Sequence, residues 1–258
     1  MTTNTPRSDA NGDAALRPGA TALVTGASSG IGAETAKALA ASGCRVICAG
    51  RARAKLDDVA ASIKDKGLAF ELDVDDRASV ASLFERLPPD WRDIDVLVNN
   101  AGHDRGGRRR FDQGSIEEWE KIIETNVIGL IRVTRVVIPQ MIARDRGHIV
   151  NIGSISGYKP YAGGTLYAGS KFAVHGFSES LRLDYRNTGI RVTEILPGMV
   201  RTGFATARWD DTSRAKKFYD DFGTCLAPED VARSVVFAVQ QPGHVVISQL
   251  VVVPSSQT

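Results

Sequence analysis

The chain has 258 residues, of which 43% are hydrophobic and 24% are charged, a composition typical of a soluble globular enzyme. This length allows one large α/β domain or two small ones, each with a full core. The formal net charge of +2 gives no indication of a nucleic-acid or acidic-membrane partner. No stretch reaches the roughly 18 apolar residues that a membrane helix needs. We therefore expect neither nucleic acid nor a membrane as a partner.

The three cysteines, Cys44, Cys48 and Cys225, cannot all pair, and none has Cys-x-x-Cys spacing. This indicates a reducing compartment, and no metal site is predicted. Residues 1–19 are polar and contain no apolar run that could form a signal peptide. We expect a disordered leader over 1–19, one domain over 20–258 and a cytoplasmic location.

The first structured unit is predicted by a short apolar strand over 20–25, a glycine-rich turn and a helical pattern over 33–41. Such a unit begins dinucleotide-binding folds, because small residues let the backbone approach a pyrophosphate at a helix N-terminus. The glycine spacing here is G-x-x-x-G-x-G rather than G-x-G-x-x-G. The alternative is a tight turn whose glycines only serve helix–strand packing. The residues that we predict to bind the cofactor are Gly26, Ser28, Ser29, Gly30, Ile31 and Gly32.

Arg51 follows the second predicted strand, 45–50. In NAD enzymes an acid roughly 20 residues beyond the glycines binds the ribose hydroxyls, whereas an arginine suits a 2′-phosphate. Arg51 stands at about that distance, and no acid precedes it on the strand. This favours NADP over NAD. The alternative is that Arg51 and Arg53 are solvated residues that open the next helix.

Strands and helices alternate along the rest of the chain. We expect strands at 68–72, 95–99, 147–153, 190–196 and 245–253, and helices at about 54–66, 78–87, 116–143 and 165–187, with a last one from 227. This alternation predicts an α/β fold: a single-domain, Rossmann-type, doubly wound parallel sheet of about seven strands with helices on both faces. Residues 199–226 have no strong periodicity, so a loop and a short helix there are predicted to form a substrate lid.

Polar residues end several of these strands, where parallel sheets bind ligands. Asp73 and Val74 end the third strand, and Asn99 and Asn100 end the fourth, although asparagines here can also be simple turn-formers. The loop 103–114 that follows carries Arg105, Arg108, Arg109 and Arg110. We interpret this loop as a flexible, solvated basic run rather than as an anion site.

Tyr167 and Lys171 lie four residues apart in the predicted helix 165–187, so the phenol and the ammonium share one face. A free tyrosine has a pKa near ~10, and a neighbouring cation favours its phenolate. The pair can then move a proton to or from an alcohol oxygen. By itself the pair could equally lie on a solvated helix face.

Seven motifs in this order give the chain a family resemblance. They are Thr25-Gly26-x-x-x-Gly30-Ile31-Gly32, Asp73-Val74, Asn99-Asn100-Ala101-Gly102, Asn126, Ser154, Tyr167-x-x-x-Lys171 and Pro197-Gly198-x-x-x-Thr202. Over residues 20–258 the chain resembles the short-chain dehydrogenases/reductases. The resemblance implies a catalytic set of Asn126, Ser154, Tyr167 and Lys171. It also implies that NADP contacts Asp73, Val74, Asn100, Ala101, Gly102, Tyr167, Lys171, Pro197, Gly198, Val200 and Thr202, in addition to the turn and Arg51.

The resemblance also implies a role for each catalytic residue. Tyr167 would be the general acid in reduction and the base in oxidation, with Lys171 lowering its pKa and holding the nicotinamide ribose. Ser154 would orient the substrate oxygen, and Asn126 would hold a water that links Lys171 to solvent. Otherwise Ser154 is a strand-end cap and Asn126 a buried amide bonded to backbone.

Stretches such as Trp91-Arg92-Asp93-Ile94-Asp95 and Pro160-Tyr161-Ala162-Gly163-Gly164 resemble the NADP-dependent 3-hydroxy acid (serine dehydrogenase-like) subgroup. That subgroup usually has Gly-Leu-Ala-Leu-Gly after Asn-Asn-Ala-Gly, but residues 103–107 here are His-Asp-Arg-Gly-Gly.

The resemblance thus implies a small-molecule hydroxy acid substrate. The alternatives are a carbonyl reductase for a 3-oxoacyl thioester or bulkier ketone, and a non-catalytic NADP-binding sensor. A carboxylate would bind an arginine, and we expect Arg201 rather than Arg105, Arg108 or Arg208. The resemblance further implies a homo-oligomer, a tetramer or dimer.

Overall fold

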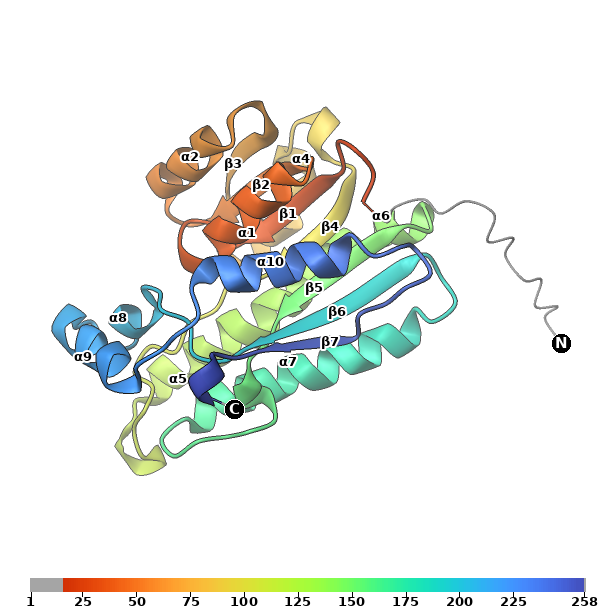
Figure 1. The fold of residues 1–258 in the computed structure, drawn as a ribbon. Helices are drawn as coiled ribbons and strands as arrows, with labels where there is room; N and C mark the ends of the chain where they lie inside the picture. Colours follow the sequence, from red (N-terminus) through yellow and green to blue (C-terminus); the bar gives the residue numbers. More distant parts are fainter. Residues whose placement is uncertain (1–15, 258) are drawn as a thin grey trace, which may run out of the picture.

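A computed structural model describes residues 16–257, so most of the expected leader lies outside the described residues. Its centre is one seven-stranded parallel sheet with strand order β3-β2-β1-β4-β5-β6-β7 (Figure 1). The strands are β1 (Thr21–Thr25), β2 (Arg45–Gly50), β3 (Gly67–Glu71), β4 (Ile94–Asn99), β5 (Gly147–Ile152), β6 (Ile190–Pro197) and β7 (Gln249–Val252). The predicted fold class is confirmed.

Helices cover both faces of this sheet and bury an apolar core on each side. The helices are α1 (Gly30–Ala41), α2 (Arg53–Ser62), α3 (Arg77–Ala81), α4 (Leu83–Arg86), α5 (Ile116–Ile123), α6 (Leu130–Ala143), α7 (Thr165–Asp184), α8 (Phe204–Trp209), α9 (Thr212–Phe222) and α10 (Pro228–Val239). One core joins the sheet to α1, α2 and α10. The other joins it to α3, α4, α6 and α7. Because both faces are covered, β1, β4, β5 and β6 are buried along their whole length.

Several element boundaries differ from the sequence predictions. The predicted helix 116–143 is interrupted, since Glu124–Gly129 is a π-helix between α5 and α6. The predicted helix 78–87 is two short helices that meet at Ser82. The last strand, β7, begins at Gln249 rather than Val245 and is an edge strand paired with β6 alone. Apolar periodicity does not report such local changes in hydrogen bonding.

The predicted lid contains two helices, α8 and α9, instead of one. They pack around Ala205, Ala215 and Tyr219, a small apolar cluster separate from the two cores of the sheet. Among residues 16–257, no helix combines the length and the apolarity needed to cross a bilayer.

Candidate active site

The predicted site residues gather at the carboxyl ends of the strands. The glycine turn connects β1 to α1, Arg51 follows β2, and Asp73 and Val74 follow β3. Asn100, Ala101 and Gly102 follow β4, Ser154 follows β5, and Gly198, Val200 and Thr202 follow Pro197 at the end of β6. In an open parallel sheet this edge is where ligands bind.

The glycine turn has the geometry of a phosphate cradle. Gly26 and Gly30 have φ of +65° and +55°, which favour glycine. A Cβ added to Gly32 would lie 2.3 Å from the carbonyl oxygen of Gly26. The N-cap residue Ser29 makes no side-chain capping bond, so the first amides of α1 are not capped by it. The turn therefore fits an anionic group placed against the start of α1.

Thr25 and Asn100 hold the turn against the end of β4. The Thr25 hydroxyl accepts hydrogen bonds from the backbone amides of Asn100 (3.0 Å) and Ala101 (3.1 Å). The Asn100 side chain donates to the carbonyl oxygens of Thr25 (2.9 Å) and Gly26 (3.2 Å). Asn99 donates to Thr134 of α6 and to Asn151 of β5. Both asparagines thus shape the site and are more than turn-formers.

The loop after β6 is fixed by the C-terminal segment and by the lid. The amide of Gly198 donates to the carbonyl oxygen of Val252 at 2.7 Å, and Val200 forms a bridge with Leu226. The Tyr219 hydroxyl of α9 donates to the carbonyl oxygen of Thr202 at 3.1 Å. A Cβ on Gly30 would lie 3.4 Å from the Thr202 side chain, so this loop faces the glycine turn.

Arg51 is exposed at the end of β2, with a guanidinium nitrogen 3.7 Å from the carboxylate of Asp75. Arg53 instead pairs with Asp57 on α2, as a helix-opening residue does. The two arginines therefore have different roles, and Arg51 remains available at the position where a 2′-phosphate is expected.

Tyr167, Ser154 and Lys171, the residues predicted to be catalytic together with Asn126, lie close together in the site. Lys171 is buried and donates to the carbonyl oxygen of Ile152 at 2.8 Å, and its Nζ lies 5.8 Å from the centre of the Tyr167 ring. The hydroxyls of Ser154 and Tyr167 share a hydrogen bond. Ser154 also accepts from the amide of Ser156 at 3.1 Å, so it is a strand-end cap as well. Phe204 of α8 lies edge-on to Tyr167, with ring centres 5.6 Å apart.

The surroundings of Tyr167 raise its pKa in this structure, and the expected effect of Lys171 on that pKa stays a prediction. Burial raises the pKa of Tyr167 above its ordinary value, the charges of Tyr161 and Asp104 raise it further, and the hydrogen bond with Ser154 lowers it. Burial also lowers the pKa of Lys171 to about 8, because desolvation disfavours its charge. Tyr167 is consequently a neutral phenol at pH 7, ready to donate a proton.

Asn126 lies in the π-helical segment, where it is almost fully buried. Its side-chain oxygen accepts from the amide of His103 at 2.9 Å, and its nitrogen donates to the carbonyl of His103 and to Ser170, both at 3.0 Å. The amide thus ties α5–α6 to the loop after β4 and to α7, as the alternative interpretation expected. π-Helical segments often occur at functional sites.

A buried ion pair between Asp104 and Arg208 was missed by the sequence analysis. Nε of Arg208 in α8 lies 2.7 Å from the Asp104 carboxylate, and the two side chains are 8% and 1% exposed. Burial raises the pKa of Asp104 to about 6, while Arg208 acts in the opposite direction. The sequence shows Asp104 as the one acid in the His-Asp-Arg-Gly-Gly stretch at 103–107, but the surrounding loop was interpreted as solvated.

The remaining arginines of the two loops lie at the surface. Arg109 pairs with Glu118 and Arg110 with Asp112, while Arg108 stacks over Tyr161 and Phe218. Arg201, which was expected to bind a carboxylate, is exposed and pairs with Asp220 at 3.2 Å. Arg208 is the arginine that packs near Tyr167, since its guanidinium lies 5.4 Å from the Phe204 ring.

A parallel seven-stranded fold with a glycine turn and a serine–tyrosine–lysine centre defines a class of enzyme, and comparisons with known proteins agree. The family model described as short chain dehydrogenase matches residues 20–213, and the chain belongs to this family.

The relatives are similar along most of their length. An NADP-dependent 3-hydroxy acid dehydrogenase YdfG from Salmonella typhi is 42% identical over 238 residues, 92% of this chain and 95% of that protein. An NADP-dependent 3-hydroxy acid dehydrogenase from Schizosaccharomyces pombe is 38% identical over 93% of this chain and 94% of its own length. The closed form of serine dehydrogenase complexed with NADP+ has a TM-score of 0.89 at 40% identity, covering 92% of this chain and 96% of that one.

Proposed function

We propose that this protein is an NADP-dependent oxidoreductase that transfers hydride between nicotinamide and a secondary alcohol or carbonyl. The observation that carries the proposal is the arrangement of Tyr167, Ser154 and Lys171 at the sheet edge beside a glycine turn. Names of similar proteins, which are NADP-dependent dehydrogenases of 3-hydroxy acids, support the same function.

The residues of the chain provide proton transfer and positioning. In carbonyl reduction, Tyr167 donates its proton to the substrate oxygen, and the neutral phenol carries that proton at pH 7. Ser154, already bonded to Tyr167, can hydrogen-bond the same oxygen and orient it. Lys171, fixed by Ile152, places a cation behind the phenol. The bound cofactor supplies or accepts the hydride at the substrate carbon.

The cofactor-binding residues fit a phosphorylated dinucleotide. The uncapped start of α1 and the close-packed glycines suit a pyrophosphate, and Arg51 suits a 2′-phosphate. We propose that Asp73, Val74, Asn100, Ala101, Gly102, Pro197, Gly198, Val200 and Thr202 line the same site, as their common position at the sheet edge supports.

The substrate that we propose is a small 3-hydroxy acid or serine-like molecule. Its carboxylate would bind Arg208, the buried arginine of the lid, rather than Arg201. Arg208 uses Nε for Asp104, and among residues 16–257 its two terminal nitrogens have no hydrogen-bond partner. A guanidinium with one edge fixed and the other free can form a bidentate carboxylate contact.

Replacing Tyr167 by Phe tests the function. The variant keeps the ring packing against Phe204 but loses the ionisable oxygen, so turnover should fall by ~10²–10⁴-fold. Fluorescence titration should show nearly unchanged NADPH binding. Retention of more than about a tenth of wild-type turnover, against this range, would exclude Tyr167 as the proton donor. Wild-type protein that binds NADPH but reduces no carbonyl in a substrate screen would instead indicate the sensor alternative.

A paired assay tests the substrate class. With a 3-hydroxy acid and its neutral methyl ester, Arg208→Ala should raise KM for the acid by about 10- to 100-fold, as expected for a lost charge-assisted hydrogen bond. KM for the ester should change little, and Arg201→Ala is the matched control on the same lid. Equal losses on acid and ester would mean that Arg208 binds no carboxylate, and would favour a ketone or thioester substrate.

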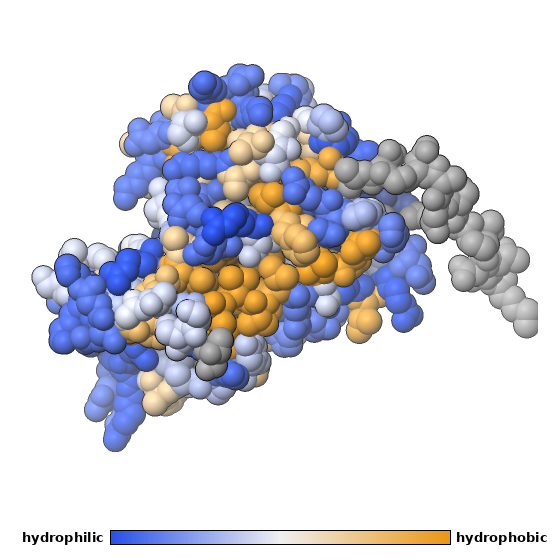
Figure 2. Space-filling model, in the orientation of Figure 1, coloured by the Kyte–Doolittle hydropathy of each residue, from blue (hydrophilic) through white to orange (hydrophobic). Residues whose placement is uncertain are grey.

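We also propose that the protein is cytoplasmic and forms a homo-oligomer, a tetramer or dimer, partly through its long helices. Apolar side chains on α6 and α7 support this, since Ile131, Phe172 and Leu183 are 36%, 44% and 66% exposed. A second apolar area lies around α10 and β7, where Phe237 and Val251 are half-exposed (Figure 2). Contiguous apolar surface of this kind marks interaction sites. Light scattering that finds only monomers would contradict the proposal.

A further inference from the structure

Glu194 is a fully buried acid in the middle of β6, and its burial needs an explanation. Its side chain is 0% exposed, in a strand buried along its whole length. One carboxylate oxygen lies 2.8 Å from Nδ1 of His175, and the other has no hydrogen-bond partner among the described residues. A charge in such a place is unfavourable unless another charge compensates it.

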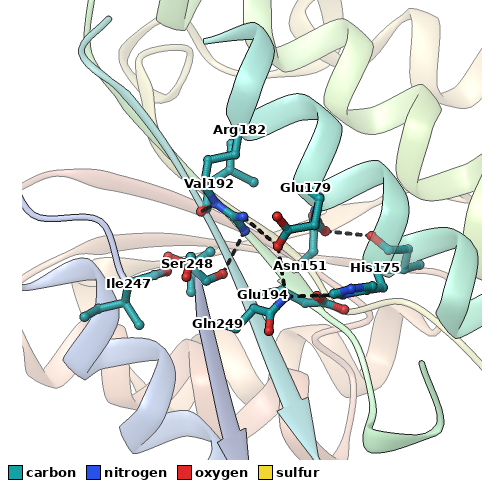
Figure 3. Close-up of polar contacts among 12 residues, drawn as sticks. Asn151, His175, Glu179, Arg182, Val192, Glu194, Ile247, Ser248 and Gln249 are labelled. Carbon is teal, nitrogen blue, oxygen red and sulfur yellow. Dashed lines mark hydrogen bonds and ion pairs between the residues drawn. The ribbon is translucent and has the colours of Figure 1, made fainter. Parts of the chain in front are cut away.

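Glu194 lies beside the strand end that holds the catalytic lysine. Lys171 donates to the carbonyl oxygen of Ile152, and a Cβ on the next residue, Gly153, would be 2.3 Å from Oε1 of Glu194. The unpartnered oxygen is therefore packed against the backbone just after the lysine's acceptor. His175 lies one helical turn beyond Lys171 on α7, so the two side chains share one face of this helix. That face therefore carries both the lysine and the histidine that pairs with Glu194. Figure 3 shows the Glu194 carboxylate directed at His175.

We propose that Glu194 is a positioning residue that acts through Lys171: its buried negative charge, anchored by His175, keeps the lysine protonated in the active site. The proposal rests on the function proposed above. A neutral lysine would not provide a cation behind Tyr167. Replacing the buried acid by an amide should therefore change the protonation of Lys171 without touching any group that contacts substrate.

The surrounding charges are consistent with this role. Burial lowers the pKa of Lys171 to about 8, and Glu194 is the charged group that opposes this effect. Burial raises the pKa of Glu194, while the hydrogen bond from His175 and the charges of His175, Lys171 and Arg182 lower it. Glu179 and Arg182 of α7 pair with each other at 2.7 Å, and Gln249 of β7 donates to Glu179 (Figure 3). Glu194 therefore contacts His175 directly and acts on Lys171 through its charge.

The test measures the titration of Lys171 directly, without substrate. In protein labelled with 13C-lysine, the Cε signal of Lys171 is assigned by its loss in Lys171→Arg and followed over pH 6–11 by NMR. We expect a midpoint of about 8 in wild type. In Glu194→Gln the midpoint should fall by about one pH unit or more, as for loss of a nearby opposite charge. The alkaline limb of kcat/KM for carbonyl reduction should move to lower pH by the same amount.

Glu179→Gln is the matched control, because it removes a carboxylate from the same face of α7 and should leave the Lys171 midpoint unchanged. Glu194→Asp keeps the charge but withdraws it from Gly153, so the midpoint should fall by less than in Glu194→Gln. If Glu194→Gln does not fold, the Lys171 midpoint in Glu194→Asp alone tests the proposal. An unchanged midpoint in the folded Glu194 variants would overturn the proposal, whatever their thermal stability.

The NMR readout also separates this proposal from the proposed function. A shifted midpoint in a protein that reduces no carbonyl would keep the Glu194–Lys171 coupling and reject the enzymatic function. An unshifted midpoint in a protein that reduces carbonyls would reject the effect of Glu194 on Lys171 and keep the enzymatic function.

Discussion

His148 should make the stability of this protein depend on pH in a way that one substitution can isolate. The ring lies in β5, 2% exposed, and its Nε2 is 2.8 Å from the Thr193 hydroxyl. Because that hydroxyl donates to the carbonyl of Ile247, Nε2 must carry the proton that His148 donates to it. The other ring nitrogen has no partner among the described residues. The His148 ring is thus neutral in the folded protein.

The magnitude follows from the difference between the folded and unfolded states. Burial lowers the pKa of His148 well below 6.5, and the charge of Arg191 lowers it further. Below pH 6.5 the unfolded chain therefore binds a proton at His148 that the folded chain does not, so stability is lost as the pH falls. One proton corresponds to about 1.36 kcal/mol per pH unit, or roughly 2 kcal/mol between pH 6.5 and 5.

The assay compares urea unfolding of wild type and His148→Gln at pH 7, 6, 5.5 and 5. Gln keeps a donor for Thr193 and cannot titrate, so the wild type should lose about 2 kcal/mol more than the variant over this range. Other groups with shifted pKa values, such as His103 and Asp104, affect both proteins equally and cancel in the difference. The exposed His244 provides a control substitution, His244→Gln. Parallel pH curves for wild type and His148→Gln would refute the reasoning.

Two further predictions concern the cofactor and the thiols. Arg51→Asp should reverse a preference for NADPH over NADH, because loss of a charge-assisted hydrogen bond costs about 10- to 100-fold in affinity. The comparison is kcat/KM with both cofactors, and a wild type that prefers NADH would contradict the assignment of Arg51. Burial raises the pKa of the Cys44 and Cys48 thiols to about 11 and 12, so iodoacetamide at pH 8 should modify Cys225 first. Mass spectrometry that finds Cys44 or Cys48 alkylated first in the folded protein would show that these strands open readily.

The sequence by itself was sufficient for features that depend on local patterns. Alternating strands and helices predict the parallel sheet, because period and length distinguish the two elements. The glycine turn and the Tyr167–Lys171 spacing are equally local, since neighbouring residues determine a turn and a helix face. The predicted positions of Arg51, Ser154 and Gly198 follow from the ends of these elements, and the structure has them there.

Only the tertiary structure decided how these groups are charged and paired. Asp104 and Arg208 are separated by 104 residues, so their contact depends on how the lid folds back over the loop after β4. Glu194 meets His175 across the sheet–helix interface, and Tyr167 keeps its proton because desolvation by the surrounding residues raises its pKa. Asn126 in the π-helix bonds to His103 in the loop after β4 and to Ser170 of α7. Burial and long-range pairing set pKa values and ion pairs, and these depend on contacts that no stretch of sequence contains.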